Sequence, residues 1–184
     1  MHKLTALLAA GVLLATSVAS HAQSPGAFWT TPTIQGYGRI HMVSHAAYRP
    51  QANQTYKIVF ALTQAAKTPT QVNPALDHVA RTVNLYVASG VPLDHLKFVA
   101  VAYGAATPLA LDNKDYRAVY GVDNPNLPLI AKLRKAGVDV AVCAQAVAEH
   151  KFHYGWVDHS VTLALSGLTT VTTLEHRGYD LMEL

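Results

Sequence analysis

Short apolar runs alternate with amphipathic segments along most of the chain. The apolar runs cover residues 56–63, 97–103, 138–142, 161–165 and 179–184. Short runs in which apolar residues predominate are typical of strands that are buried on both faces. Between them, apolar residues recur at three and four positions in residues 74–90, 125–136 and 168–177, which is the spacing of helices with one buried side. Residues 105–121 also favour a short helix.

Two of these helices have recognisable start and stop signals. Asn73-Pro74 supplies a capping side chain and a proline at the first helical position, where no backbone donor is lost. Asp123-Asn124-Pro125 repeats the same pattern before the second helix. Gly90 and Gly137 follow the last apolar positions and are expected to end the two helices.

Strands that alternate with helices predict an α/β fold. We expect a single domain with a mostly parallel five-stranded sheet covered by helices on both faces, spanning residues 56–184. Composition agrees, since 184 residues with 51% hydrophobic and 14% charged content suffice for one well-buried core. The sequence shows no internal repeat and no second domain.

The first 22 residues have the pattern of a secretory signal peptide. Lys3 precedes an apolar stretch from Leu4 to Val18, and Ser20-His-Ala22 matches a cleavage site. The apolar stretch is too short to span a bilayer, so we expect cleavage after Ala22 and export to the periplasm without membrane attachment. Residues 23–55 follow as an N-terminal arm that we expect to dock on the domain through its aromatic residues, although a flexible leader before Ile34 is an equally good interpretation.

Charge and motifs exclude several classes of function. The net charge of +3 has no clustered basic face, so nucleic acid is not an expected partner. The sequence lacks the glycine-rich turn of dinucleotide-binding proteins, the phosphate-binding loop of nucleotide-binding proteins, and the Gly-x-Ser-x-Gly elbow of hydrolases. No cofactor is expected.

Cys143 is the only cysteine, and it closes the third predicted strand. In a parallel sheet, ligands bind beyond the carboxyl ends of the strands. If a helix begins at Ala144, backbone donors near the sulfur favour the thiolate. An exported chain with a single thiol has no internal disulfide partner, so Cys143 is either a buried packing residue or a functional one.

Other polar side chains are candidates for the same region. Tyr103 and Gly104 end the second predicted strand and face the same edge as Cys143. His150 and His153 follow the cysteine and would border the thiol and tune its charge, or remain surface residues. With His159 they also offer a mixed Cys/His metal site, but the spacing matches no structural zinc pattern, and no metal site is assigned.

Several segments together resemble the DsrE/DsrF-like family, in its exported, periplasmic branch. The resemblance covers residues 56–184 and rests on Asn124–Gln145, which contains Gly137-Val-Asp-Val-Ala-Val-Cys143-Ala-Gln145, on Leu165-Ser-Gly-Leu168, and on Leu174-Glu-His-Arg-Gly-Tyr179. It implies a small α/β fold, assembly into homo-trimers or hexamers, and a cysteine, here Cys143, that carries sulfane sulfur as a persulfide. Members of this branch commonly have Cys-Gly-Gln and a His-Gly pair, where this chain has Cys143-Ala144-Gln145 and Tyr103-Gly104.

These observations lead to two main hypotheses. In the first, the protein is a periplasmic sulfur carrier or sulfurtransferase-like protein in which Cys143 exchanges sulfur with a donor or acceptor protein and Gln145 positions the sulfur. In the second, it is a non-catalytic oligomeric module that binds a small ligand or partner, and Cys143 only lines the pocket. Metal binding through Cys143 and the histidines is a minor third reading.

Overall fold

The computed structural model describes residues 28–184, and the predicted signal peptide lies outside this range. Five strands form one sheet: β1 (Tyr56–Leu62), β2 (Leu96–Ala102), β3 (Asp139–Cys143), β4 (Thr162–Ala164) and β5 (Asp180–Glu183). Five α-helices are α1 (Pro74–Ala88), α2 (Asn113–Tyr120), α3 (Leu127–Lys135), α4 (Ala144–Glu149) and α5 (Gly167–His176). Short 3₁₀ helices cover Leu93–His95, Gly104–Ala110 and Tyr154–Trp156.

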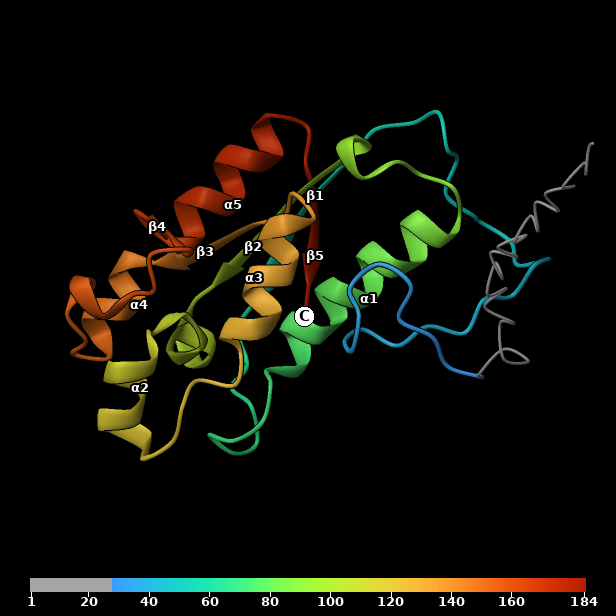
Figure 1. The fold of residues 1–184 in the computed structure, drawn as a ribbon. Coiled ribbons are helices and arrows are strands. Elements are labelled where there is room, and N and C mark those ends of the chain that lie inside the picture. Colours follow the sequence, from blue (N-terminus) through green and yellow to red (C-terminus); the bar gives the residue numbers. More distant parts are fainter. Residues whose placement is uncertain (1–27) are drawn as a thin grey trace, which may run out of the picture.

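All four strand pairings are parallel, and the strand order is β4-β3-β2-β1-β5 (Figure 1). From β1 to β4 the chain moves across the sheet in one direction. It then returns through α5 to place β5 on the other side of β1. Since crossovers between parallel strands are right-handed, this reversal of direction puts α5 on the opposite face from α1 and α3. The predicted sheet with helices on both faces is confirmed.

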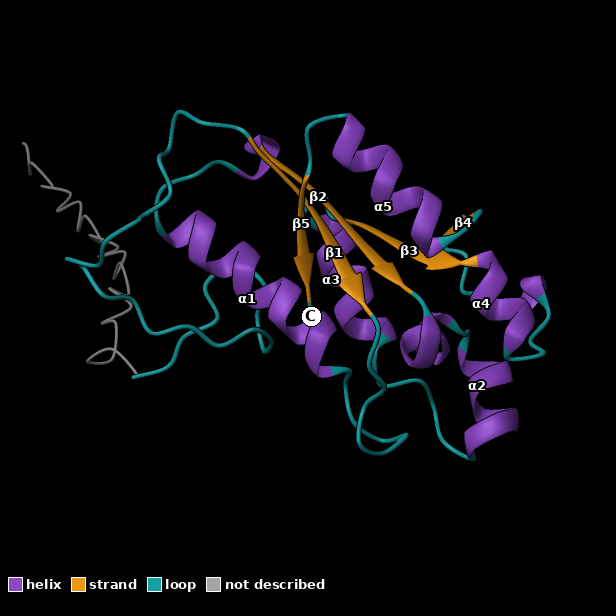
Figure 2. Cartoon of the chain, turned by 180° about the vertical axis from the view of Figure 1, so that it is seen from behind, coloured by secondary structure: helices purple, strands orange, loops and turns teal. Residues whose placement is uncertain are grey.

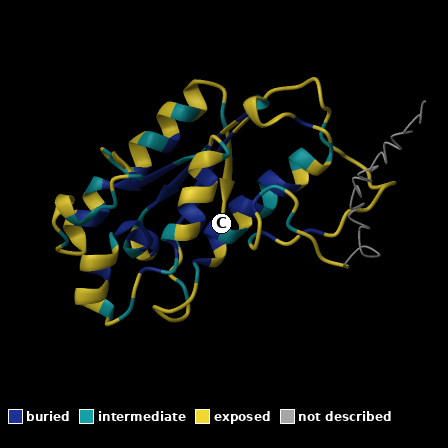
Figure 3. Ribbon diagram, in the orientation of Figure 1, coloured by how far each residue is buried: buried dark blue, intermediate teal, exposed yellow. Residues whose placement is uncertain are grey.

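Helices lie on both sides of the sheet (Figure 2), and the two faces bury different amounts of apolar surface (Figure 3). The face under α1 and α3 holds the larger core, in which Phe60 and Phe98 are almost fully buried with ring centroids 5.4 Å apart. The α5 face holds a smaller cluster around Val59, Val101 and Val171. Alternate residues of one strand contribute to opposite faces, so both clusters use the same strands.

The predicted start of α1 is confirmed, whereas the predicted start of α3 is wrong. The Asn73 side chain accepts hydrogen bonds from the backbone of Ala75 and Leu76. Helix α3 begins after Asn126, which makes no capping bond with its side chain. Asn124 is 2% exposed and donates instead to the carbonyls of Leu109 and Leu111. The Asn124 amide thus provides hydrogen bonds to a buried loop. These tertiary contacts outweigh the preference of asparagine for the N-cap of the next helix.

Asn84 on α1 anchors the N-terminal arm. Its side chain is fully buried, accepts hydrogen bonds from the backbone of Thr33 and Ile34, and donates to the carbonyls of Tyr37 and Gly38. One side chain of α1 thereby provides hydrogen-bond partners for backbone groups of the arm, which has no regular secondary structure to pair them.

The expectation that aromatic residues dock the arm is largely wrong. Ile34 and Ile40 are the arm's buried side chains, at 2% exposure each. Phe28 and Trp29 remain 65% and 49% exposed. Among the arm aromatics, Tyr37 packs against the core.

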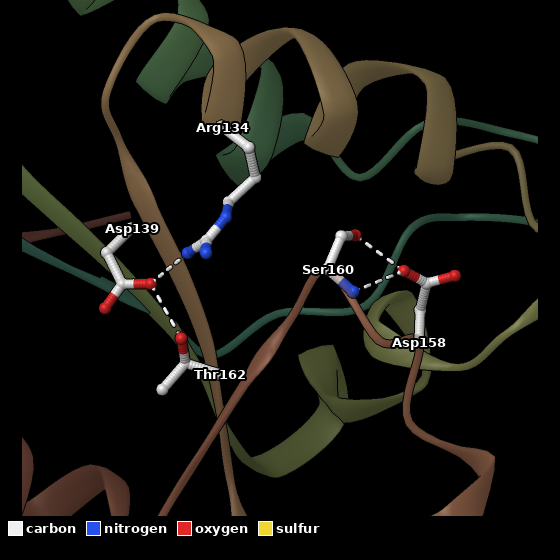
Figure 4. A network of polar contacts seen from close by, with 5 residues as sticks. All are labelled: Arg134, Asp139, Asp158, Ser160 and Thr162. Carbon is white, nitrogen blue, oxygen red and sulfur yellow. Dashed lines mark hydrogen bonds and ion pairs between the residues drawn. The ribbon is translucent and has the colours of Figure 1, made fainter.

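Polar contacts fix the short edge strand β4 to its neighbour (Figure 4). Asp139, at the start of β3, accepts a hydrogen bond from the Thr162 hydroxyl at 2.8 Å and pairs with Arg134. In the preceding turn, the Asp158 carboxylate accepts from the backbone N–H of Ser160 at 2.9 Å. These contacts set where β4 ends, opposite Cys143.

Candidate functional site

Cys143 occupies the junction between β3 and α4. It is the last residue of the strand and the N-cap of the helix, and its Sγ accepts a hydrogen bond from the backbone N–H of Ala146 at 3.3 Å. The residue is 5% exposed. The sulfur is therefore nearly enclosed and has one backbone N–H directed at it.

The chain leaves β3 and β4 toward opposite faces of the sheet. After β3 it enters α4, which packs with the larger core through Val147, and after β4 it enters α5 on the other face. In open α/β sheets, ligands commonly bind beyond the carboxyl ends of adjacent strands whose connections go to opposite faces. Gln145 donates to the carbonyl of Leu165, just after β4, at 3.2 Å. Cys143 and Gln145 therefore both lie at this edge of the sheet.

Tyr103 lies beside Cys143 on the same face of the sheet. Ala102 pairs with Val142, so the residues that follow them end neighbouring strands at the same level. The Tyr103 ring packs with the α5-face cluster and against Gly167, the first residue of α5. Because Gly167 has no side chain, the helix approaches the ring closely enough to fix its orientation.

Burial raises the pKa of the Tyr103 hydroxyl above its ordinary value of 10.0, and the nearby charges of Glu183 and Cys143 raise it further. The hydroxyl therefore remains a neutral donor at physiological pH. Glu183 lies on β5, opposite Ala61 of β1, and the sequence analysis did not identify it. The order of the strands brings it to Tyr103, and that order is not visible in the local sequence.

The structure separates the two candidate histidines. The His150 Nε2 is 2.9 Å from the carbonyl oxygen of Gly104, so this imidazole links the end of α4 to the turn after β2. His153 instead contacts the Trp156 ring, with centroids 5.1 Å apart. Within residues 28–184, neither histidine forms a hydrogen bond with Cys143. Only His150 is thus joined to another predicted site residue.

A small cavity opens at the same edge of the sheet, beyond the ends of β1 and β2. Its volume is about 120 Å³. Cys143 is absent from its lining, and the polar side chains that line it are those of Lys67, Thr68, Asn73, Tyr116, Tyr120 and Asn126. Tyr116 closes one side by donating from its hydroxyl to the carbonyl of Pro69 at 2.9 Å.

The described residues show neither a metal-binding cluster nor a membrane-spanning helix. Residues 28–184 contain no group of three or more His, Cys, Asp or Glu side chains arranged to hold a metal ion. Over the same range, none of the helices combines the length and apolar character that crossing a membrane requires.

The family is decided by the match of residues 40–184 to the family model described as DsrE/DsrF-like. This chain belongs to the DsrE/DsrF-like family. The match begins within the arm, so the arm from Ile40 onward belongs to the region that the family shares. The resemblance read from the sequence is confirmed.

One solved structure similar to this DsrE-family chain is that of the protein of unknown function MTH1491 from Methanobacterium thermoautotrophicum. The two share 15% sequence identity with a TM-score of 0.52, and the similarity covers 70% of this chain and 99% of the other. At this identity the likeness supports the fold alone. A search of curated proteins found no match.

The departure from the Cys-Gly-Gln run of the DsrE family has a local explanation. Ala144 is the first residue of α4 and does not have a positive φ angle, so this turn does not need glycine. Its β-carbon therefore causes no backbone strain at the site.

Proposed function

We propose that this DsrE-family protein is a sulfur carrier in which Cys143 holds sulfane sulfur as a persulfide. The observation that carries the proposal is the position of Cys143 at the carboxyl ends of β3 and β4, with Sγ accepting the N–H of Ala146. In a persulfide this N–H would still contact Sγ, while the outer sulfur carries the negative charge.

The proposed sulfur transfer occurs in two steps, each an attack of a thiolate on the outer sulfur of a persulfide. In the first, the Cys143 thiolate attacks the outer sulfur of a donor persulfide, the new S–S bond forms at Sγ, and the donor leaves as a thiolate. In the second, an acceptor thiolate attacks the outer sulfur on Cys143, and the Cys143 thiolate is released. Neither step needs an oxidant, a metal or a cofactor, because the sulfur is already in the sulfane state.

Tyr103 and Gln145 have distinct roles in this proposal. The neutral Tyr103 hydroxyl lies close enough for the Cys143 charge to raise its pKa, and it would donate to the outer sulfur. The Gln145 amide is held beside the end of β4 by its bond to the carbonyl of Leu165 and would orient the incoming donor. Tyr103 thereby supplies the donor at the position where other members have histidine.

Intact-protein mass spectrometry tests the carrier role. Incubation with glutathione persulfide should add one sulfur atom to Cys143, about 32 Da, and the added sulfur should be removed by dithiothreitol. The Cys143→Ser variant is the control and should stay unmodified. Alkylation of the native thiol by iodoacetamide reports whether the sulfur can be reached. An alkylated but never persulfidated Cys143 would refute the carrier role.

A second candidate is a non-catalytic binding module. Two observations favour it: Cys143 is only 5% exposed, and the nearby cavity is lined by Asn73, Asn126, Tyr116 and Tyr120 rather than by the cysteine. In that case Cys143→Ser would leave the cellular phenotype unchanged, whereas filling the cavity with Ala106→Leu would abolish it. The metal hypothesis gains no support from the geometry of residues 28–184.

We also propose that the protein is exported through residues 1–22, acts in the periplasm and assembles into a homo-trimer or hexamer. The support is the leader pattern and the implied properties of the family. Leu163, Leu165 and Leu168, on β4 and between β4 and the first turn of α5, are 43%, 71% and 72% exposed, and such a patch fits burial in an assembly. Mass determination of the isolated protein tests cleavage after Ala22, and light scattering after size-exclusion chromatography tests the subunit number.

A further inference from the structure

A second exposed apolar surface lies on the N-terminal arm, far in sequence from Cys143. We call it the arm face and define it by Phe28, Trp29, His41, Met42, Val43 and Tyr48. Phe28, Trp29, Val43 and Tyr48 are 65%, 49%, 56% and 103% exposed, and Met42 is 37% exposed. Large apolar side chains gathered on a surface mark an interaction site more reliably than isolated ones do.

The arm face is continuous because His41 joins its two halves. The His41 ring stacks on Phe28 with centroids 4.1 Å apart, and Phe28 meets Trp29 edge to face at 5.3 Å. His41 also lines a groove of about 330 Å³ together with Met42, Val43 and Tyr48. The base of this groove is formed by α1 through Leu85 and Tyr86.

The backbone holds the arm face in place. Thr30 and Ile40 form an antiparallel bridge with hydrogen bonds of 2.9 Å in both directions. Tyr48 has a φ of +53°, a conformation that is costly for a bulky residue, and its ring extends fully into solvent. Strain of this kind is typical of side chains that are positioned for binding.

The charge of the arm is of one sign. Residues 28–55 contain Arg39, Arg49, His41 and His45 and no aspartate or glutamate. Arg39 lies over the Trp29 ring at 5.8 Å from its centroid, and Arg49 donates to the carbonyl of Ser44. Exposed tryptophan and tyrosine rings bordered by arginine match the boundary between lipid headgroups and acyl chains, where an aromatic ring has one apolar and one polar side.

We propose that the arm face binds the surface of bilayers that contain anionic phospholipids. Phe28, Trp29 and Val43 enter the headgroup region, and Arg39 and Arg49 pair with lipid phosphates. A bilayer suits this surface better than a protein groove does, because the exposed side chains are spread over an irregular segment with a uniform positive charge. The proposal is independent of sulfur transfer at Cys143.

Vesicle binding tests the proposal with protein produced from the full sequence. Trp156→Phe leaves Trp29 as the only tryptophan, so its fluorescence reports on the arm face. Vesicles of equal parts phosphatidylcholine and phosphatidylglycerol should shift the Trp29 emission to the blue, and brominated lipids should quench it. Vesicles of phosphatidylcholine alone should bind about tenfold more weakly.

A matched charge variant makes the test specific. R39Q/R49Q should weaken binding to the anionic vesicles about tenfold, whereas K97Q/K114Q, which removes two exposed charges outside the arm, should change it less than twofold. Any leader that remains is the same in both variants, so it cannot produce the difference. Equal binding by both variants, or Trp29 emission that ignores vesicles, overturns the proposal. A dimer that W29A dissociates, without lipid binding, would assign the surface to a second copy of the chain.

Discussion

Tyr103 and Gly167 pack so closely that the glycine leaves no room for a side chain. A β-carbon built on Gly167 would lie 2.6 Å from Cδ1 of Tyr103. Gly167 opens α5 and Tyr103 follows β2, so this contact connects the helix on the second face of the sheet to the neighbour of Cys143.

Gly167→Ala should displace the Tyr103 ring and lower the free energy of unfolding by about 1–3 kcal/mol, because the added methyl overpacks the contact. Urea denaturation measures the loss. Gly155→Ala is the control, since a β-carbon there meets no heavy atom within 4 Å. The displaced ring should also change the rate at which iodoacetamide alkylates Cys143. Equal stabilities for the two variants would show that Tyr103 can move at no cost.

The free energy of unfolding should decrease as the pH rises above about 10, and Tyr103 should contribute to this decrease. Its pKa is raised in the folded protein, so between the unfolded and folded values the unfolded chain binds fewer protons. The stabilisation is complete below pH 10 and is lost as the pH rises through the folded value. Tyr86, Tyr116 and Tyr120 shift in the same direction.

Urea denaturation between pH 8 and about pH 11 checks this prediction. Tyr103→Phe should make the alkaline decline shallower. Tyr48→Phe, at a fully exposed side chain, is the matched control for the loss of one hydroxyl. A decline that is identical in the Tyr103→Phe variant would contradict the raised pKa.

Asn84→Ala should lower the free energy of unfolding by about 2–4 kcal/mol, because two backbone donors and two carbonyls of the arm lose their partner. The arm should then become sensitive to trypsin after Arg39, since the bond after Arg49 leads to Pro50 and resists trypsin. Urea denaturation and limited proteolysis measure the two effects. Asn53→Ala, at an exposed position of the same arm, is the control. An arm that stays resistant would mean that Ile34 and Ile40 suffice to hold it.

Gly36 and Gly38 should respond differently to alanine although both have positive φ angles, +85° and +60°. A β-carbon at Gly38 would lie 2.2 Å from the backbone nitrogen of Arg81, whereas one at Gly36 meets nothing within 4 Å. Gly36→Ala should cost about 1 kcal/mol from conformation alone. Gly38→Ala should cost at least about 2 kcal/mol more, because α1 or the arm must move. Parallel thermal denaturation of both variants compares them, and similar losses would exclude the close contact as the cause.

Much of the fold was predictable because local periodicity reflects burial. All five strands and the helices α1, α3 and α5 lie where the apolar spacing predicted them, within two residues at most ends. The start of α3 was mispredicted because Asn124 and Asn126 both fit a capping pattern locally. Tertiary contacts decide between them, since Asn124 is used by the buried carbonyls of Leu109 and Leu111.

The candidate site was predictable only where it depends on strand ends. Cys143 and Tyr103 lie at the edge that the sequence indicated, and Gln145 and His150 contact neighbouring loops there. Glu183 was missed because its approach to Tyr103 depends on β5 pairing with β1, and this pairing joins the two ends of the domain. His153 was grouped with His150 by spacing, but α4 ends at Glu149: His150 caps that helix, whereas His153 precedes the next 3₁₀ helix.

The pairing of β5 with β1 also determines when the domain can form during synthesis. The first strand made, Tyr56–Leu62, lies between β2 and the last strand made, Asp180–Glu183. One edge of β1 therefore stays without its partner until Glu183 has emerged from the ribosome, and α5 can cover its face of the sheet only at that stage. A nascent chain of this kind completes its sheet only when this late strand is free to pair with one of the earliest.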